Sequence, residues 1–312
     1  MRAALSSSLV RLAKENPRVV LLTGDHGYAL FDEFRRECPS QYINAGIAEQ
    51  NMVGVAAGLA RAGFHPIVYG LAAFIPVRVL EQIKIDICHD NLPVILLGDG
   101  AGVVYSSLGT SHQSCEDIAC MRAIPQITIL SPCDRFELTA AMDFAATHAG
   151  AVYLRVGKAD LGDVHDAPHH LAPAKLLNIR QKDKGINFLA TGSMVRTAME
   201  VAQTFPEASV WSAPFVKPLD QAQVELISHN ATTIVTFEEH SIFGGFGSAI
   251  SEIISSTVSP IPILRIGVED RFSEHCGSYK YLIEEHGLDT ASVLRKIDAF
   301  EKRLGRRPTN GI

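Results

Sequence analysis

Short, β-branched apolar runs alternate with longer amphipathic segments along almost the whole chain. VVLLTG at 19–24 precedes the helix-length segment at 48–63, and the helix-length segment at 74–89 precedes PVILLG at 93–98. Further strand-like runs lie at 66–70, 126–130, 151–156, 186–191, 209–213, 232–240 and 262–267. Strands that alternate with helices form parallel sheets covered by helices on both faces. The pattern therefore predicts an α/β fold built from doubly wound domains.

One segment interrupts the alternation and divides the chain. Residues 161–185 contain two prolines and scattered charges, which is typical of a linker. The sequence therefore predicts a parallel-sheet domain at 1–160 and a second α/β domain at 186–312, closed by a helix at 290–303. A length of 312 residues suits two domains of ordinary size.

Charge and composition exclude several classes of protein. Lys and Arg number 28 against 34 Asp and Glu, and the resulting formal charge of −6 is opposite to that of a typical nucleic-acid-binding protein. No apolar stretch approaches the roughly 18 residues of a membrane span. Arg11 and Lys14 interrupt the place of a signal-peptide core, and the six cysteines form no CxxC motif. We therefore expect a cytoplasmic protein with reduced thiols and no nucleic-acid or membrane partner.

Chemically versatile side chains follow several of the predicted strands. They are Asp25, Glu49, Phe74, the loop from Gly100 to His112, and Arg155. In open parallel sheets, ligands bind outside the carboxyl ends of the strands, so these residues are expected along one edge. Spacing alone leaves a structural role open for each of them. The structural alternatives are a turn residue for Asp25, an acid at a helix start for Glu49 and a core residue for Phe74.

The run GIAEQNMVGVAAGLARAGFHPIV resembles the pyrimidine-binding domain of transketolase-family enzymes, which use thiamine diphosphate. The resemblance continues in order through GTSHQSCEDIACMRAIP, LATGSMVRTAMEVA and IVTFEEHSIFGGFGSAISE, and it covers nearly the whole chain. The pairing of GIAEQNMVG with EEH and GGFGSA makes it specific. The resemblance implies a pyrimidine-binding domain followed by a transketolase C-terminal α/β domain.

The resemblance also implies roles for the candidate residues. Glu49 matches the glutamate that hydrogen-bonds the cofactor's aminopyrimidine ring and promotes its imino form. Phe74 matches an aromatic residue that stacks on the pyrimidine, and Asp25 matches an acid near the cofactor. His112 matches a substrate-facing histidine that stabilises charge on the donor. Arg155 matches an arginine that grips substrate phosphate, to which a planar guanidinium is well suited.

Several positions depart from the family pattern. Leu71 and Val77 replace aromatic residues, so the contact surface for the pyrimidine is thinner. Gly100 stands in the place of a histidine and Leu108 in the place of an aspartate that binds a sugar hydroxyl. A site loses strongly when the polar partner of a hydroxyl becomes a leucine. We therefore expect retained cofactor chemistry on a deoxy, modified or non-sugar donor.

Three motifs suggest chemistry but are assigned none. GDG at 98–100 resembles a magnesium motif of thiamine enzymes, but the downstream asparagine that would complete it is missing. The histidine-rich tract at 165–170 is expected to be a solvated stretch of the linker. The EEH motif at 238–240 matches a family motif that supports subunit packing. No metal ligand is therefore expected on this chain.

A full-length transketolase has a diphosphate-binding domain before the pyrimidine-binding domain, whereas only 48 residues precede Glu49 here. The resemblance therefore implies the C-terminal subunit of a split transketolase, which transfers a two-carbon ketol or related acyl unit through the cofactor's ylid. An N-terminal subunit would hold the diphosphate and Mg²⁺. We expect an α2β2 heterotetramer with self-dimerisation and a small sugar or sugar-phosphate substrate.

Two alternatives stay open at this point. One is the β subunit of a 2-oxo acid dehydrogenase E1, which has similar domains and length. The other is a non-catalytic transketolase paralogue that acts as a structural or regulatory partner. The replacements at Gly100 and Leu108 support the paralogue, whereas the retained Glu49 and His112 oppose it.

Overall fold

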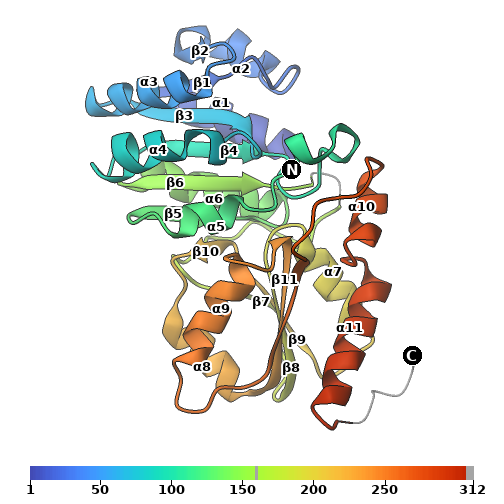
Figure 1. Cartoon of the computed structure of the whole chain (residues 1–312). Helices are drawn as coiled ribbons and strands as arrows, with labels where there is room; N and C mark the ends of the chain where they lie inside the picture. Colours follow the sequence, from blue (N-terminus) through green and yellow to red (C-terminus); the bar gives the residue numbers. More distant parts are fainter. Residues whose placement is uncertain (159–160, 307–312) are drawn as a thin grey trace.

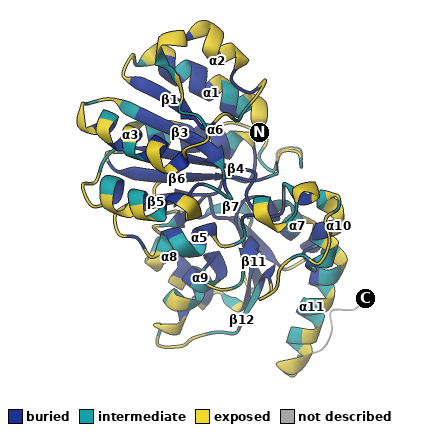
Figure 2. Cartoon of the chain, turned by 45° about the horizontal axis from the view of Figure 1, so that its top comes forward, coloured by how far each residue is buried: buried dark blue, intermediate teal, exposed yellow. Residues whose placement is uncertain are grey.

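The computed structural model describes residues 1–158 and 161–306, and it contains two helix-covered β-sheets, one above the other in Figure 1. The central strands are buried in each half, and the outward faces of the helices are exposed (Figure 2). The predicted α/β fold with two doubly wound units is confirmed. Within the part of the chain that the structure describes, no helix is long and apolar enough to cross a membrane.

The first sheet has seven strands in the order β10-β5-β6-β4-β3-β1-β2, and all neighbours are parallel except β10 and β5. Its strands are β1 (Val19–Thr23), β2 (Tyr42–Asn44), β3 (His65–Leu71), β4 (Ile95–Asp99), β5 (Ile127–Leu130), β6 (Ala151–Val156) and β10 (Phe215–Lys217). Its helices are α1 (Arg2–Glu15), α2 (Asp32–Glu37), α3 (Glu49–Arg61), α4 (Leu80–Gln82), α5 (Asp117–Arg122) and α6 (Arg135–Thr147), with short 3₁₀ turns η1 (Pro39–Gln41), η2 (Val77–Val79), η4 (Ser106–Leu108) and η5 (Thr110–His112) and the π-helical turn η3 (Ile83–Cys88).

Successive residues of the central strands pack on opposite faces of this sheet. Val20 and Leu22 of β1 contribute to the core that contains α3, whereas Val19 and Leu21 contribute to the core that contains α1 and α6. This alternation follows from the two-residue period of a strand. Because both faces are buried, the strands are continuous apolar runs, which is the pattern seen in the sequence.

The second sheet has five strands in the order β12-β11-β8-β9-β7, with α7 and α11 on one face and α8 and α9 on the other. Its strands are β7 (Leu177–Arg180), β8 (Gly185–Ala190), β9 (Ser209–Ser212), β11 (Ala231–Ser241) and β12 (Ile263–Val268). Its helices are α7 (Met194–Val201), α8 (Gln221–His229), α9 (Phe246–Ser255), α10 (Tyr279–Glu285) and α11 (Thr290–Arg303).

The structure differs from the predicted linker at 161–185. Leu177–Arg180 forms β7, an antiparallel edge strand of the second sheet. His165 donates its backbone N–H to Asp134 at 2.8 Å, and its ring lies 2.9 Å from a carboxylate oxygen of Glu137. The expectation of a solvated histidine tract is therefore wrong for His165, because a buried carboxylate of α6 holds its ring.

The segment 74–89, expected as one helix, is broken into η2, α4 and η3. Pro76 precedes η2, and its ring disfavours the helical conformation of the residue before it, so a regular helix is not favoured at the start of the segment. The backbone N–H of Arg78 donates to the carbonyl of Phe74 at 3.2 Å. This turn places the side chains of Phe74 and Arg78 on the same side.

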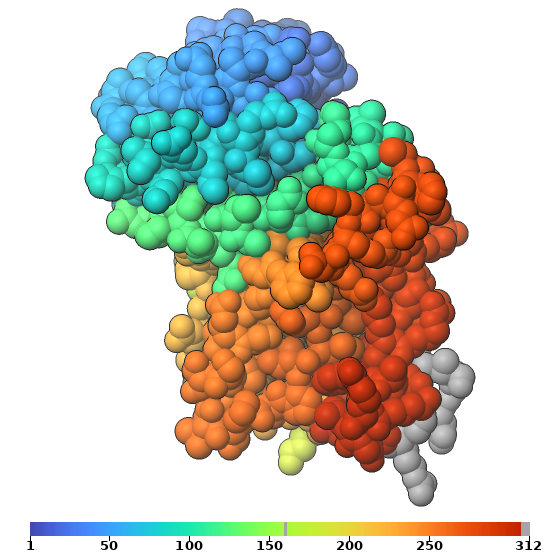
Figure 3. Space-filling model, in the orientation of Figure 1, coloured from blue at the N-terminus to red at the C-terminus, as the bar shows by residue number. Residues whose placement is uncertain are grey.

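The two halves pack on each other through buried polar groups. Glu239 of β11 accepts hydrogen bonds from the backbone N–H of Val103 at 2.8 Å, from the hydroxyl of Tyr279 at 2.7 Å and from the hydroxyl of Ser193. The N–H of Gly277 donates to the carbonyl of Ser106 at 3.4 Å. Figure 3 shows the same contact, with orange-red C-terminal atoms against the green loop of the first unit.

A buried ion pair lies at the centre of this contact. Nε of Arg155, at the end of β6, donates to Asp117 Oδ2 at 2.8 Å, and Asp117 is fully buried at the start of α5. Nη2 of Arg155 donates to the carbonyl oxygens of Ser114 at 3.2 Å and of Glu239 at 2.7 Å. The guanidinium therefore connects β6 and the 100–116 loop to β11 of the second sheet.

We expect Asp117→Ala to destabilise the chain strongly, because it leaves the buried guanidinium of Arg155 without a counter-charge. The free energy of unfolding in urea should fall by about 3–5 kcal/mol. The double variant Asp117→Ala/Arg155→Met should recover much of the loss. Asp90→Ala, which breaks the exposed pair with Arg61, is the matched control and should change stability little. Equal losses from Asp117→Ala and Asp90→Ala would contradict this account.

Candidate functional site

The carboxyl ends of the parallel strands in the first sheet carry most of the candidate residues. Glu49 begins α3, Phe74 lies in the turn after β3, and His112 ends η5 after β4. Glu49 and Phe74 share a guanidinium partner, and the rings of Phe74 and His112 contact each other. The structure therefore brings these three residues together at one edge, where the sheet topology predicts a ligand.

Glu49 is a buried carboxylate with one close cationic partner. Its side chain is 4% exposed at the N-terminus of α3, where the helix dipole favours negative charge. Its Oε1 accepts a hydrogen bond from Arg78 Nη1 at 2.9 Å and lies 4.0 Å from His26 Nε2. A carboxylate held in this way can exchange its partner for another planar N–H donor.

Three rings and a guanidinium gather near Glu49. The half-buried Phe74 ring has its centroid 5.4 Å from that of His112, in an edge-on arrangement, and 6.2 Å from that of His26. The Cζ atom of Arg78 lies 3.9 Å from the centroid of the Phe74 ring. Flat groups of this kind offer a surface on which a planar heterocycle can stack.

The sequence pattern did not single out His26 and Arg78. His26 directly follows Asp25 after β1, and Arg78 stands four residues after Phe74. Their positions next to two candidate residues could have identified both of them. Burial is the main cause that lowers the pKa of His26, which keeps its ring neutral near pH 7. A neutral ring can take part in stacking without repelling the guanidinium.

Asp25 and Leu71 border this cluster. Asp25 is exposed, has a φ of 60° and accepts a hydrogen bond from Asn44 Nδ2 at 3.1 Å. Leu71 ends β3, and its carbonyl accepts the backbone N–H groups of Phe74 and Ile75, both at 2.8 Å. Leu71 therefore shapes the turn that presents Phe74.

Gly100 and Leu108 have different surroundings, although both belong to the loop after β4. Gly100 is buried with a φ of 73°, and a Cβ there would lie 2.0 Å from the Tyr105 ring. A histidine could not occupy this place unless Tyr105 moved. Leu108 lies in η4 and is 53% exposed, so its apolar side chain faces outward.

The structure does not bring Arg155 into the cluster. Its side chain is 3% exposed, and it is bonded to Asp117 and to two backbone carbonyls. The expected contact between Arg155 and a substrate phosphate does not fit this placement, because Nε and Nη2 are already engaged inside the chain. A strand end in the sequence predicted the correct edge of the sheet but not the direction of the side chain.

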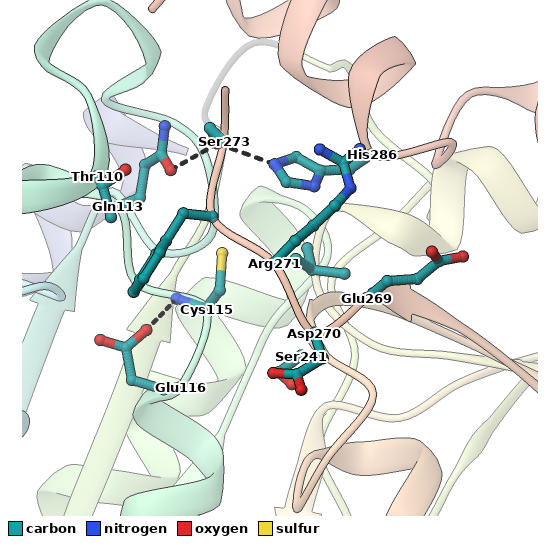
Figure 4. A pocket seen from close by; sticks show the side chains of 12 residues that line it. Thr110, Gln113, Cys115, Glu116, Ser241, Glu269, Asp270, Arg271, Ser273 and His286 are labelled. Carbon is teal, nitrogen blue, oxygen red and sulfur yellow. Dashed lines mark hydrogen bonds between the residues drawn. The ribbon is translucent and has the colours of Figure 1, made fainter. Parts of the chain in front are cut away.

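A separate cavity of about 490 Å³ lies between the two halves. Figure 4 shows its lining, in which Ser273 donates to Gln113 Oε1 at 2.8 Å and lies 2.9 Å from His286 Nε2. Burial raises the pKa of the Cys115 thiol, which keeps it protonated and weakly nucleophilic. Glu49, Phe74 and His112 do not line this cavity, so it is distinct from the cluster.

Two groups of possible metal ligands are engaged within the chain. Asp99, the acid of GDG, accepts hydrogen bonds from the hydroxyls of Tyr69 at 2.7 Å and Tyr105 at 3.1 Å. Donor atoms of Cys133, Glu137 and His165 lie within 4.8 Å of one another. The Glu137 carboxylate accepts a hydrogen bond from the backbone N–H of Cys133 at 2.8 Å and pairs with His165. These contacts give both groups a structural role.

Comparisons with known proteins agree with this architecture. Residues 1–163 match the family described as transketolase, pyrimidine binding domain, and residues 175–293 match the family described as transketolase, C-terminal domain. A solved split gene transketolase, described as an inactive beta4 tetramer, superposes with a TM-score of 0.85 and is 32% identical. The match covers 95% of this chain and 96% of that one.

Two relatives are similar over almost their whole length. An apulose-4-phosphate transketolase subunit of Phocaeicola vulgatus is 31% identical over 307 residues, with 97% of each chain covered. A 6-deoxy-6-sulfo-D-fructose transketolase subunit of a Clostridium species is 33% identical over 306 residues, with 96% of this chain and 94% of the relative covered. These matches support a transketolase-like transferase rather than a 2-oxo acid dehydrogenase β subunit. The chain therefore belongs to the transketolase family, as a C-terminal component made of a pyrimidine-binding and a C-terminal domain.

Proposed function

We propose that this chain is the C-terminal subunit of a split, thiamine diphosphate-dependent transketolase that transfers a two-carbon ketol or related acyl unit from a modified sugar. The observation that carries the proposal is the buried Glu49 carboxylate beside the ring surface of Phe74 and His112. We place the enzyme in cytoplasmic carbohydrate metabolism.

The cluster suits an aminopyrimidine ring. Glu49, as a carboxylic acid, would donate a hydrogen bond to the ring nitrogen and share that proton with it, and Phe74 would orient the ring by stacking. His112, half-buried at the end of η5, would face the substrate and stabilise charge on its oxygen. Thiamine diphosphate, when bound, supplies the nucleophilic carbon and the electron sink. Asp25 and Leu71 would border the same ring.

A partner subunit would complete the cofactor site. Among the described residues, Cys133, Glu137 and His165 form the one close group of possible metal ligands, and its contacts are internal. We therefore assign Mg²⁺ and the diphosphate to an N-terminal subunit. The solved split gene transketolase is an inactive beta4 tetramer, which supports a β chain that self-associates and is inactive without its partner.

Exposed apolar residues close to Glu49 in the sequence support the location of that interface. Ile47 is 78% exposed, and Ile43 and Val55 are also exposed. A Cβ added at Gly54 or Gly58 of α3 would have no atom within 4 Å, so another backbone can approach this helix closely. We propose an α2β2 assembly in which this surface meets a neighbouring subunit.

The substrate proposal rests on the loop after β4. Leu108 is exposed where the family pattern has an aspartate for a sugar hydroxyl, and Gly100 has no room for a side chain. An apolar group at Leu108 favours a donor that lacks or modifies that hydroxyl. The names of the relatives, which refer to apulose 4-phosphate and 6-deoxy-6-sulfofructose, support an unusual sugar or sugar phosphate.

Glu49→Gln in the assembled enzyme should abolish turnover, because an amide cannot accept and return the ring proton. We expect at least a roughly 100-fold loss in kcat. Glu225→Gln, at an exposed position of α8, is the matched control and should keep full activity. Unchanged turnover with Glu49→Gln would instead favour a non-catalytic paralogue.

The purified chain alone should show no thiamine diphosphate-dependent turnover, and addition of the N-terminal subunit should restore it. Light scattering of the mixture should give the mass of two copies of each chain. Ketol transfer by the chain alone would overturn the split-subunit proposal.

A further inference from the structure

We propose that Arg78 is a built-in competitor for the cofactor's pyrimidine ring, which must be displaced from Glu49 and Phe74 before the ring can bind. The inference rests on the proposed function, since it assigns a role to a residue of that same site. It adds a residue that tunes cofactor affinity.

Arg78 makes the two contacts that a planar nitrogen heterocycle would make. Its Nη1 donates to Glu49 Oε1 at 2.9 Å, and its Cζ lies 3.9 Å from the centroid of the Phe74 ring. A guanidinium is flat and delocalised, so it can stack on an aromatic face and donate in its plane to a carboxylate. An aminopyrimidine ring is also flat, and once its ring nitrogen has taken up a proton it donates in its plane to a carboxylate in the same direction.

The two occupants exclude each other on this face of Phe74. A separation of 3.9 Å is van der Waals contact, so no second flat group fits between the guanidinium and the ring. The acceptor oxygen of Glu49 is also shared, because Oε1 faces both Arg78 and His26. A ring that binds Glu49 and stacks on this face therefore has to displace the Arg78 side chain.

The position of Arg78 allows that displacement. Its side chain is 45% exposed, and it extends from the short turn η2 rather than from a long helix. Among the described residues, Glu49 and Phe74 are the partners that its guanidinium contacts. Its backbone carbonyl accepts from Gln50 Nε2 at 3.4 Å, which involves the main chain only.

The pairing also explains how a buried carboxylate is stabilised before the ring arrives. An unpaired charge at Glu49 would be costly to bury, and Arg78 supplies its counter-charge. Binding then exchanges one planar partner for another. The free energy of cofactor binding therefore depends on the difference between the free energies of the two pairings. Removal of Arg78 should strengthen cofactor binding.

The test is calorimetric binding of thiamine diphosphate with Mg²⁺ to the assembled enzyme, without substrate. Arg78→Met keeps a side chain of similar length but removes the charged, planar guanidinium. It should lower the Kd for thiamine diphosphate about five-fold, which is the equivalent of one partly exposed ion pair. Arg78→Lys keeps the charge for Glu49 and should change Kd less than Arg78→Met does. Arg36→Met, at an exposed position of α2, is the control and should leave Kd unchanged.

The outcomes separate this inference from the proposed function. If the wild-type enzyme binds the cofactor and Arg78→Met binds it with an equal or higher Kd, the role of Arg78 is overturned. The proposed function is not affected by that result. Wild-type enzyme that does not bind thiamine diphosphate would overturn the proposed function and this inference with it. Circular dichroism and thermal unfolding of each variant verify that the folded assembly is being compared.

Discussion

The guanidinium of Arg155 connects the two halves of this protein, because it pairs with Asp117 in the first half and donates to a backbone carbonyl of the second. It lies where β6 ends and α5 begins, and the same guanidinium bonds the carbonyl of Glu239 in β11. A buried charge needs a fixed counter-charge and filled hydrogen bonds, and β11 of the second sheet supplies one of the hydrogen-bond acceptors. The loop from residue 100 to 116, which includes His112, is held between the two sheets through Val103 and Ser114.

Along one edge of the first sheet, the residues that bind the second unit are different from the candidate site residues. β6 and the loop after β4 use their polar groups to bind the second unit, whereas Asp25 after β1 is exposed and Phe74 after β3 is half-buried. The loop that carries His112 is therefore anchored through Val103 and Ser114. Ile47 and Val55 are exposed, and the subunit interface proposed above lies at this edge.

Arg78 changes how the Glu49 site is understood. A buried carboxylate and an aromatic ring suffice to describe a pyrimidine site, but their contacts are already made by the guanidinium. The chain thus stabilises its own charge at the start of α3 with a side chain that is 45% exposed. In the role proposed for Arg78, cofactor affinity depends on an exchange of partners, and not only on the contacts that the cofactor itself makes.

The sequence by itself determined the α/β class, the two-unit order and most of the strands and helices, because apolar periodicity is a local property of the chain. It also identified the sheet edge and three clustered residues, Glu49, Phe74 and His112. Only the tertiary structure decided that Arg155 points into the core, that β10 joins the first sheet, and that Arg78 and His26 meet Glu49. These outcomes depend on contacts between segments far apart in the chain. Burial and charge pairing decide the direction of a side chain there, and the periodicity of the sequence does not.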